Sequence, residues 1–64
     1  MTTHGIERLY TTKHVAELWS AHPETIRRLA AKGELRSVRV GSERRYPESA
    51  LREYLQRRAD EEAA

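Results

Sequence analysis

Two short helical patterns, separated by a short break at Ser20-Ala21-His22, limit the folds that are open to this chain. Apolar residues recur at i, i+3 and i+4 in both, at Val15, Leu18 and Trp19 and again at Ile26, Leu29 and Ala30. We therefore expect a first helix over residues 12–20 and a second over residues 23–32. Helices this short are marginal in isolation, so they must pack against each other and against further elements.

The residues around these patterns favour a tight turn between two helices. Thr11 is a good N-cap for the first helix. Pro23 suits the first position of the second helix, where its missing N–H costs nothing. Gly33 follows the last periodic residue and is the usual C-terminal stop. Two short helices joined in this way are typical of a helix-turn-helix.

After Gly33 the periodicity changes from helical to alternating. Residues 38–40 and 44–46 are two short strand patterns around the turn signal Gly41-Ser42. Pro47 ends the second strand, and an apolar stripe (Ala50, Leu51, Tyr54, Leu55) predicts a third helix over residues 48–58. We expect a mainly α fold with a small β-hairpin, a winged helix-turn-helix in the order helix, helix, hairpin wing, helix.

This pattern predicts a single domain over residues 9–58. We expect flexible segments at residues 1–8 and 59–64, the latter acidic. A chain of 64 residues is long enough for one domain but too short for a deep enclosed active site. It has no cysteine, no apolar run long enough to span a membrane and no signal-peptide pattern. We expect a protein of the bacterial cytoplasm that has no contact with a membrane.

Charge is concentrated in the middle of the chain. Residues 26–47 hold seven basic and two acidic residues, a net charge of +5. Residues 1–25 hold two basic and three acidic residues, a net charge of −1, and residues 48–64 hold three basic and five acidic residues, a net charge of −2. A basic stretch between acidic flanks is the electrostatic pattern of a nucleic-acid binder, so we expect double-stranded DNA as the partner.

Two sets of side chains are candidate DNA contacts. A helix fits the major groove, where arginine can make two hydrogen bonds to guanine, and the second helix offers Glu24, Thr25, Arg27, Arg28 and Lys32. Arginines crowded on a short ribbon repel one another unless a polyanion is present, and the hairpin region offers Arg36, Arg39, Ser42, Arg44 and Arg45. The alternative interpretations are a solvated helix face and charges that protect an edge strand from aggregation.

The remaining polar and aromatic residues do not indicate chemistry. His4, His14 and His22 match no metal-ligand spacing, so we expect no metal and no cofactor. Trp19 has the spacing of a core residue. No nucleophile–base set or phosphate-binding loop is present, and we expect no enzymatic activity.

The motifs in this order resemble the excisionase-type, MerR-like winged-helix family. The resemblance covers residues 10–55 and rests on Thr25-Ile26-Arg27-Arg28, Gly33-Glu34-Leu35, Arg39-Val40-Gly41, Arg44-Arg45-Tyr46 and Ala50-Leu51. It implies that residues 23–32 are the recognition helix and residues 39–46 the wing. Lys13 and His14 stand where members often carry acidic residues, and Ser20 replaces a frequent glycine at the turn.

The resemblance implies that the protein is a recombination directionality factor of a phage or integrated element. Such a protein binds near an attachment site, bends the DNA and helps an integrase to assemble the excision complex. The alternatives are a small MerR-like transcriptional regulator and, in another class, a protein-interaction module such as an antitoxin or adaptor. The sequence after the third helix does not continue into the long dimerisation helix of MerR regulators, so we do not expect ligand-sensing activation. We also expect head-to-tail self-association on DNA, through the basic wing and the acidic residues Asp60, Glu61 and Glu62. The alternative is a symmetric dimer through the third helix, with Tyr54 and Leu55.

Overall fold

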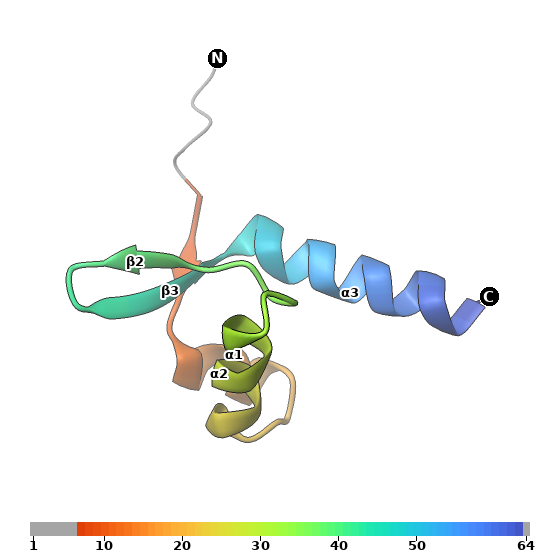
Figure 1. The fold of residues 1–64 in the computed structure, drawn as a ribbon, viewed down its shortest axis with the longest axis horizontal. Helices are drawn as coiled ribbons and strands as arrows, with labels where there is room; N and C mark the ends of the chain where they lie inside the picture. Colours follow the sequence, from red (N-terminus) through yellow and green to blue (C-terminus); the bar gives the residue numbers. More distant parts are fainter. Residues whose placement is uncertain (1–6, 64) are drawn as a thin grey trace, which may run out of the picture.

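The computed structural model describes residues 7–63. Its elements in chain order are β1 (Leu9–Tyr10), α1 (Thr12–Leu18), α2 (Pro23–Ala31), β2 (Val38–Val40), β3 (Glu43–Pro47) and α3 (Glu48–Ala63). In Figure 1 the β2–β3 hairpin and α3 extend in opposite directions from the centre, and α1 and α2 lie together on one side of that line. None of the helices in this part of the chain is both long and apolar enough to cross a membrane.

Local hydrogen bonds set the ends of the first two helices. The Thr11 hydroxyl accepts a hydrogen bond from the backbone N–H of His14 at 3.0 Å, which confirms the predicted N-cap of α1. His22 caps α2, because its Nδ1 accepts from the backbone N–H of Glu24 at 3.1 Å. Gly33 follows the end of α2 with a φ of +79°, a conformation that glycine adopts without strain.

The sheet has one more strand than the sequence predicts. Its order is β1-β3-β2 and both pairings are antiparallel, with Tyr10 opposite Tyr46 and Arg39 opposite Arg44. Gly41 turns the hairpin with a φ of +65°. β1 is only two residues long, and it exists because β3 offers it an edge. Nothing in its own sequence alternates, so local pattern could not reveal it.

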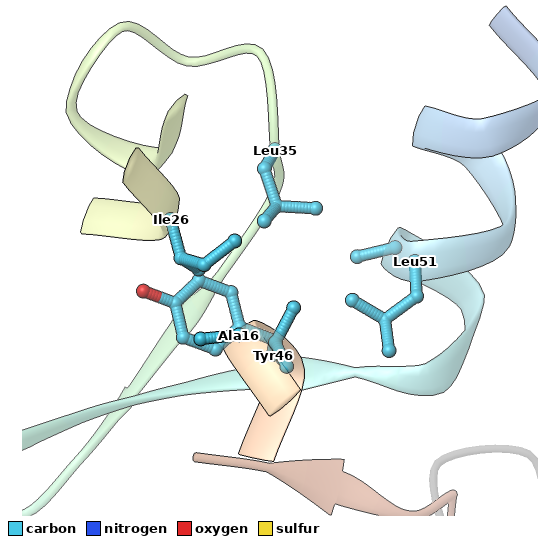
Figure 2. Close-up of a cluster of buried hydrophobic side chains, with 7 residues drawn as sticks. Ala16, Ile26, Leu35, Tyr46 and Leu51 are labelled. Carbon is cyan, nitrogen blue, oxygen red and sulfur yellow. The ribbon is translucent and has the colours of Figure 1, made fainter. Parts of the chain in front are cut away.

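The core lies where α1, α2, β3 and the start of α3 meet. Figure 2 shows the Tyr46 ring from β3 beside Ile26 of α2 and Ala16 of α1. The Tyr46 hydroxyl accepts a hydrogen bond from the Thr12 hydroxyl at 3.0 Å, so this buried polar group is satisfied. The complete buried set is Val15, Ala16, Ile26, Leu35, Tyr46, Ala50 and Leu51.

Two aromatic rings extend the core along α3, and one predicted core residue does not belong to it. Trp19 stacks on Tyr54 with ring centroids 5.2 Å apart, in agreement with the core position predicted for Trp19. Leu18, predicted to face inward, is 55% exposed. The buried face of α1 is formed by the consecutive residues Val15 and Ala16, which turns Leu18 toward solvent. The helix also ends at Leu18, two residues earlier than predicted.

The predicted end of the third helix at Arg58 is wrong, because α3 continues to Ala63. Glutamate and alanine are good helix formers, and no glycine or proline interrupts this segment. The added turn also carries favourable pairs, a hydrogen bond from Gln56 to Asp60 at 3.1 Å and an ion pair of Arg58 with Glu61 at 3.6 Å. The predicted flexible tail is therefore helical over residues 59–63, and residue 64 lies outside the described residues.

The last two residues of the segment 1–8, which was expected to be flexible, make contacts with the rest of the domain. Residues 1–6 lie outside the described residues. The Glu7 carboxylate accepts two hydrogen bonds from Ser49, and the Arg8 carbonyl accepts one from the backbone N–H of Glu48 at 3.0 Å. These contacts hold residues 7 and 8 against the start of α3. Apart from β1, the arrangement confirms the predicted winged helix-turn-helix fold.

Candidate nucleic-acid interface

The outer surface of α2 is charged, as predicted from the sequence. Arg27 and Arg28 are both exposed; Arg28 lies opposite the buried Ile26 on the helix, and Arg27 lies on the flank between them. Arg27 forms an ion pair with Glu24 at 3.1 Å, one turn earlier. That contact is exposed, so it orients the guanidinium more than it stabilises the fold.

The other residues predicted on this surface have different surroundings. Thr25 is half-buried. Lys32 follows the last helical residue and lies 3.7 Å from the Glu34 carboxylate, an exposed ion pair. No hydrogen bond or ion pair within residues 7–63 holds the Arg28 side chain, so its five N–H donors remain available to a ligand.

The hairpin carries three arginines in distinct environments. Arg44 donates a hydrogen bond to the Ser37 hydroxyl at 2.8 Å, and Arg45 forms an ion pair with Glu43 at 2.7 Å. Arg39 lies directly across the ladder from Arg44. Side chains alternate along a strand, so Arg44 shares a face of β3 with the core residue Tyr46. Arg44 and Arg39 are thereby on the same side of the sheet as α1 and α2.

This geometry produces a hollow of about 360 Å³ between the helices and the wing. It is lined by the basic residues Lys13, Arg27, Arg39, Arg44 and Arg45 and by Thr11, Thr12, Ser42 and Glu43. The single carboxylate is paired with Arg45, so the surface is strongly positive. An open, basic and hydroxyl-rich hollow suits phosphate groups of a nucleic-acid backbone rather than an apolar small molecule.

Five of the ten predicted contacts thus meet in one place: Arg27, Arg39, Ser42, Arg44 and Arg45. The sequence interpretation missed Lys13 and the two threonines before it, which enter the hollow from the start of α1. A signal for Lys13 was present, since it stands where the resembling family often carries an acidic residue. Glu24, Thr25, Arg28 and Lys32 lie on α2 or directly after it, outside the lining of this hollow.

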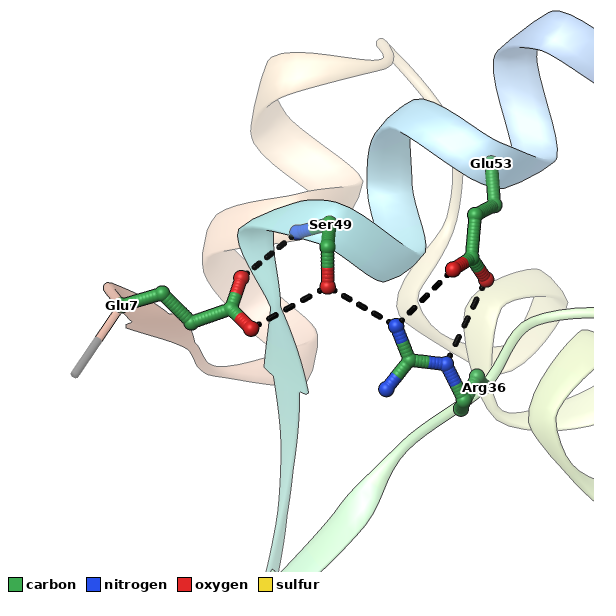
Figure 3. A network of polar contacts seen from close by, with 4 residues as sticks. All are labelled: Glu7, Arg36, Ser49 and Glu53. Atoms are coloured by element: carbon green, nitrogen blue, oxygen red, sulfur yellow. Dashed lines mark hydrogen bonds and ion pairs between the residues drawn. The ribbon is translucent and has the colours of Figure 1, made fainter. Parts of the chain in front are cut away.

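Arg36 is the one predicted contact that the structure directs elsewhere. Its guanidinium donates to the Glu53 carboxylate at 3.1 and 3.3 Å and to the Ser49 hydroxyl at 2.8 Å (Figure 3). Ser49 in turn donates its N–H and hydroxyl to Glu7 at 2.8 and 3.1 Å. The hydrogen bond to Glu53 raises the pKa of Arg36. The pKa of Glu7 is lowered, chiefly by the backbone hydrogen bond from Ser49.

The histidines have structural roles where they are described. His22 caps α2, and the His14 ring is tilted against Tyr10 with centroids 5.0 Å apart. His4 lies outside the described residues. Among residues 7–63, no group of three or more histidine, aspartate or glutamate side chains is arranged to hold a metal ion.

The chain matches one family of known domains over most of its length. Residues 9–59 match a family model described as a helix-turn-helix domain, and this range runs from β1 into the C-terminal half of α3. No curated protein and no solved structure matches the chain. The matched range contains both helices of the turn, the hairpin and the basic hollow between them. The chain therefore belongs to this family of helix-turn-helix domains.

Proposed function

We propose that this protein binds double-stranded DNA sequence-specifically and acts as an excisionase, the factor that directs an integrase toward excision. Membership of the helix-turn-helix family supports the DNA-binding part of this proposal. The observation that carries it is the basic hollow, in which Arg27 of α2 meets Arg39 and Arg44 of the hairpin. A surface that joins helix and wing in this way fits two neighbouring parts of one duplex.

In this proposal α2 enters the major groove. Arg27 and Arg28 reach base edges from its exposed side. Glu24 accepts a hydrogen bond from cytosine or orients Arg27. Thr25 and Lys32 lie at the margins of the contact. The helix is nine residues long, enough to present its first two turns to the bases. This part of the surface supplies the sequence preference.

The hairpin contacts the backbone beside that groove. Arg39, Arg44 and Arg45 supply phosphate contacts, and Ser42 at the turn adds a hydroxyl. Lys13 joins them from α1 and extends the contact on the far side of the hollow. We leave Arg36 out of the contact set because its guanidinium is directed to Glu53 and Ser49. These contacts supply affinity with little sequence preference.

The excisionase role rests on the family resemblance of the motifs and on the size of the domain. One recognition helix reads only a few base pairs, too few to single out a site in a genome. Bending the DNA and recruiting an integrase supply the missing specificity. In this role the protein performs no covalent chemistry, and the recombinase cuts and joins the strands.

Self-association on DNA is the second source of specificity in this proposal. The acidic end of α3, with Asp60, Glu61 and Glu62, points away from the basic hairpin, on the opposite side of the domain (Figure 1). Because these two surfaces are far apart in one chain, they can meet only between neighbouring copies. A head-to-tail contact of this kind does not close, and it would form a short filament along adjacent sites. Each contact is weak and exposed, so the copies associate only when adjacent DNA sites hold them at a high local concentration.

An excision assay tests the role directly. Purified integrase and a substrate with attachment sites are incubated with and without this protein, and excised product is measured. The proposal expects excision to depend on the protein and DNA bending to accompany its binding. Binding without any effect on recombination would favour a transcriptional regulator. Absence of DNA binding, combined with salt-sensitive binding of an acidic protein, would favour an interaction module.

A further inference from the structure

Arg36 is a charged residue of the basic middle of the chain that lies in an acidic environment. Its guanidinium faces the Glu53 carboxylate directly and is linked through the Ser49 hydroxyl to Glu7 (Figure 3). One positive charge among two negative charges leaves the cluster with a net charge of −1. Such a cluster repels phosphate, so attraction to DNA does not explain why an arginine stands at this position.

The neighbouring residue connects this cluster to the wing. Arg36 and Ser37 are consecutive and directly precede β2. The side chain of Arg36 is held by α3, whereas the Ser37 hydroxyl accepts the 2.8 Å hydrogen bond from Arg44. The two side chains therefore brace the start of β2 from two sides, one toward α3 and one toward the wing arginine.

The two hydrogen bonds to Glu53 use both the Nε and the Nη2 of Arg36. A bidentate pair fixes the orientation of a planar guanidinium in a way that a lysine ammonium cannot. The backbone at residue 36 is thereby held at a defined position on α3. Ser37 then presents its hydroxyl from that position, and Arg44 is held where it lines the basic hollow.

We propose that Arg36 is a positioning residue for DNA binding, which acts through Ser37 on Arg44 and does not contact DNA itself. The inference rests on the proposed function, since it assigns a role to a residue outside the DNA surface. It makes Glu53, an acidic residue on α3, necessary for full DNA affinity. From charge alone, removal of an acidic residue should strengthen DNA binding, whereas the positioning role predicts that removal of Glu53 weakens it.

The main test compares two carboxylates of α3. Glu53→Ala removes the partner of Arg36, and Glu48→Ala removes the partner of Arg52, an ion pair of 3.0 Å on the same helix. Each variant gains one unit of positive charge, so bulk electrostatics predicts equal or tighter DNA binding for both. The probe is a fluorescein-labelled duplex selected from a random pool with the wild-type protein, and anisotropy gives the affinity.

We expect Glu53→Ala to bind the duplex about twofold to fivefold more weakly than the wild type, the range that follows from loss of one exposed ion pair. Glu48→Ala should bind as tightly as the wild type or tighter. Arg36→Gln, which removes the other partner, should weaken binding to the same extent as Glu53→Ala. In an Arg44→Ala background, Arg36→Gln should leave the slope of log affinity against log salt unchanged, because Arg36 itself contacts no phosphate.

A double-mutant cycle tests whether the effect passes through Arg44. In an Arg44→Ala background, Glu53→Ala should cause no further loss, because the side chain that it positions is absent. Thermal unfolding of every variant confirms that the exposed substitutions leave the domain folded.

The possible failures are distinguishable. If the wild type does not bind DNA, the proposed function itself fails and this inference fails with it. If the wild type binds but Glu53→Ala binds equally or more tightly, only the positioning role is overturned. A decrease of about one in the salt slope on Arg36→Gln that persists in the Arg44→Ala background would show that Arg36 itself contacts a phosphate, which also overturns the inference. An undiminished loss in the Arg44→Ala background would overturn the path through Ser37.

Discussion

Arg39 and Arg44 lie directly opposite each other on the two strands of the hairpin. No carboxylate within residues 7–63 forms an ion pair with either side chain. Like charges at opposite positions destabilise an antiparallel pair by a few tenths to about 1 kcal/mol. The hairpin therefore carries an electrostatic cost in the free protein, and a polyanion placed against it removes that cost. The pair of arginines therefore favours DNA binding at the expense of the folding stability of the free protein.

Replacing one member of the pair should separate the two effects. We expect Arg39→Thr to raise the free energy of unfolding by about 0.2–1 kcal/mol, because the repulsion is lost and threonine suits a strand. The same variant should bind DNA more weakly. Urea denaturation and duplex titration measure the two quantities. If Arg39→Thr is less stable than the wild type, the two arginines do not repel each other in the folded protein.

DNA binding should depend steeply on salt. The hollow contains five basic side chains, and Arg28 lies exposed nearby on α2. Arg27 and Arg28 in the groove also displace counterions, so we expect the basic surface to neutralise the equivalent of five to seven phosphates, which gives a slope of log affinity against log salt of about −4 to −6. Titrations of one duplex over a series of salt concentrations give the slope. A slope near zero would contradict DNA binding by this surface.

The recognition helix and the wing should respond differently to truncation. Arg27→Ala or Arg28→Ala should weaken binding to the cognate site by about 1–3 kcal/mol and relax the base preference. Arg44→Ala or Arg45→Ala should weaken all sequences more evenly, because phosphate contacts carry no sequence information. Selection of duplexes from a random pool with each variant measures the preference. Unchanged affinity in folded α2 variants would mean that α2 does not enter the groove.

Local patterns in the sequence predicted the helices, the hairpin and most of the residues around the hollow. Thr11, Pro23 and Gly33 act within a few residues of themselves, so their roles follow from sequence alone. β1 could not be predicted in this way, because it forms only against β3, which lies far along the chain.

The sequence also could not predict the direction in which a long charged side chain points. Arg36 belongs to the basic middle of the sequence, but its partner Glu53 is seventeen residues away on α3. Only the packing of α3 against the sheet places the two groups together. Lys13 enters the hollow for the same reason, because α1 and the wing meet only in the folded chain. Charge counts along the sequence cannot distinguish these two environments.

The contact between Glu7 and Ser49 should make stability depend on pH in the acidic range. The pKa of Glu7 is lowered, chiefly by the backbone N–H of Ser49, so the ionised carboxylate is the form that favours the folded state. This contribution is complete above the ordinary glutamate value of about 4.3 and is lost as the pH falls through the lowered pKa.

The variant Glu7→Gln tests this dependence. It should be less stable than the wild type near neutral pH, and the two melting temperatures should converge as the pH falls below about 4. Glu17→Gln is the control, because the Glu17 carboxylate makes no hydrogen bond or ion pair with residues 7–63. A difference between Glu7→Gln and the wild type that stays constant from neutral to acidic pH would show that the carboxylate charge is not what matters.

The backbone conformation of Ser20, in the turn between α1 and α2, leads to a direct prediction about stability. Ser20 has a φ of +53°, and no other residue except glycine has a positive φ within residues 7–63. A side chain in this left-handed conformation costs about 1–2 kcal/mol, and glycine avoids that cost because it has no Cβ. Glycine also gains freedom in the unfolded chain, which offsets about 0.4–1 kcal/mol of the benefit.

The first effect is larger, so Ser20→Gly should stabilise the domain by about 0.5–1 kcal/mol. For a domain of this size the melting temperature should rise by about 2–8 °C. Ser20→Asn should be close to neutral or mildly stabilising, because asparagine tolerates this conformation, and Ser20→Val should destabilise. Ser20 is exposed and does not line the basic hollow, so DNA affinity should be unchanged in the glycine variant. A lower melting temperature for Ser20→Gly would mean that contacts of the serine outweigh the strain of its backbone.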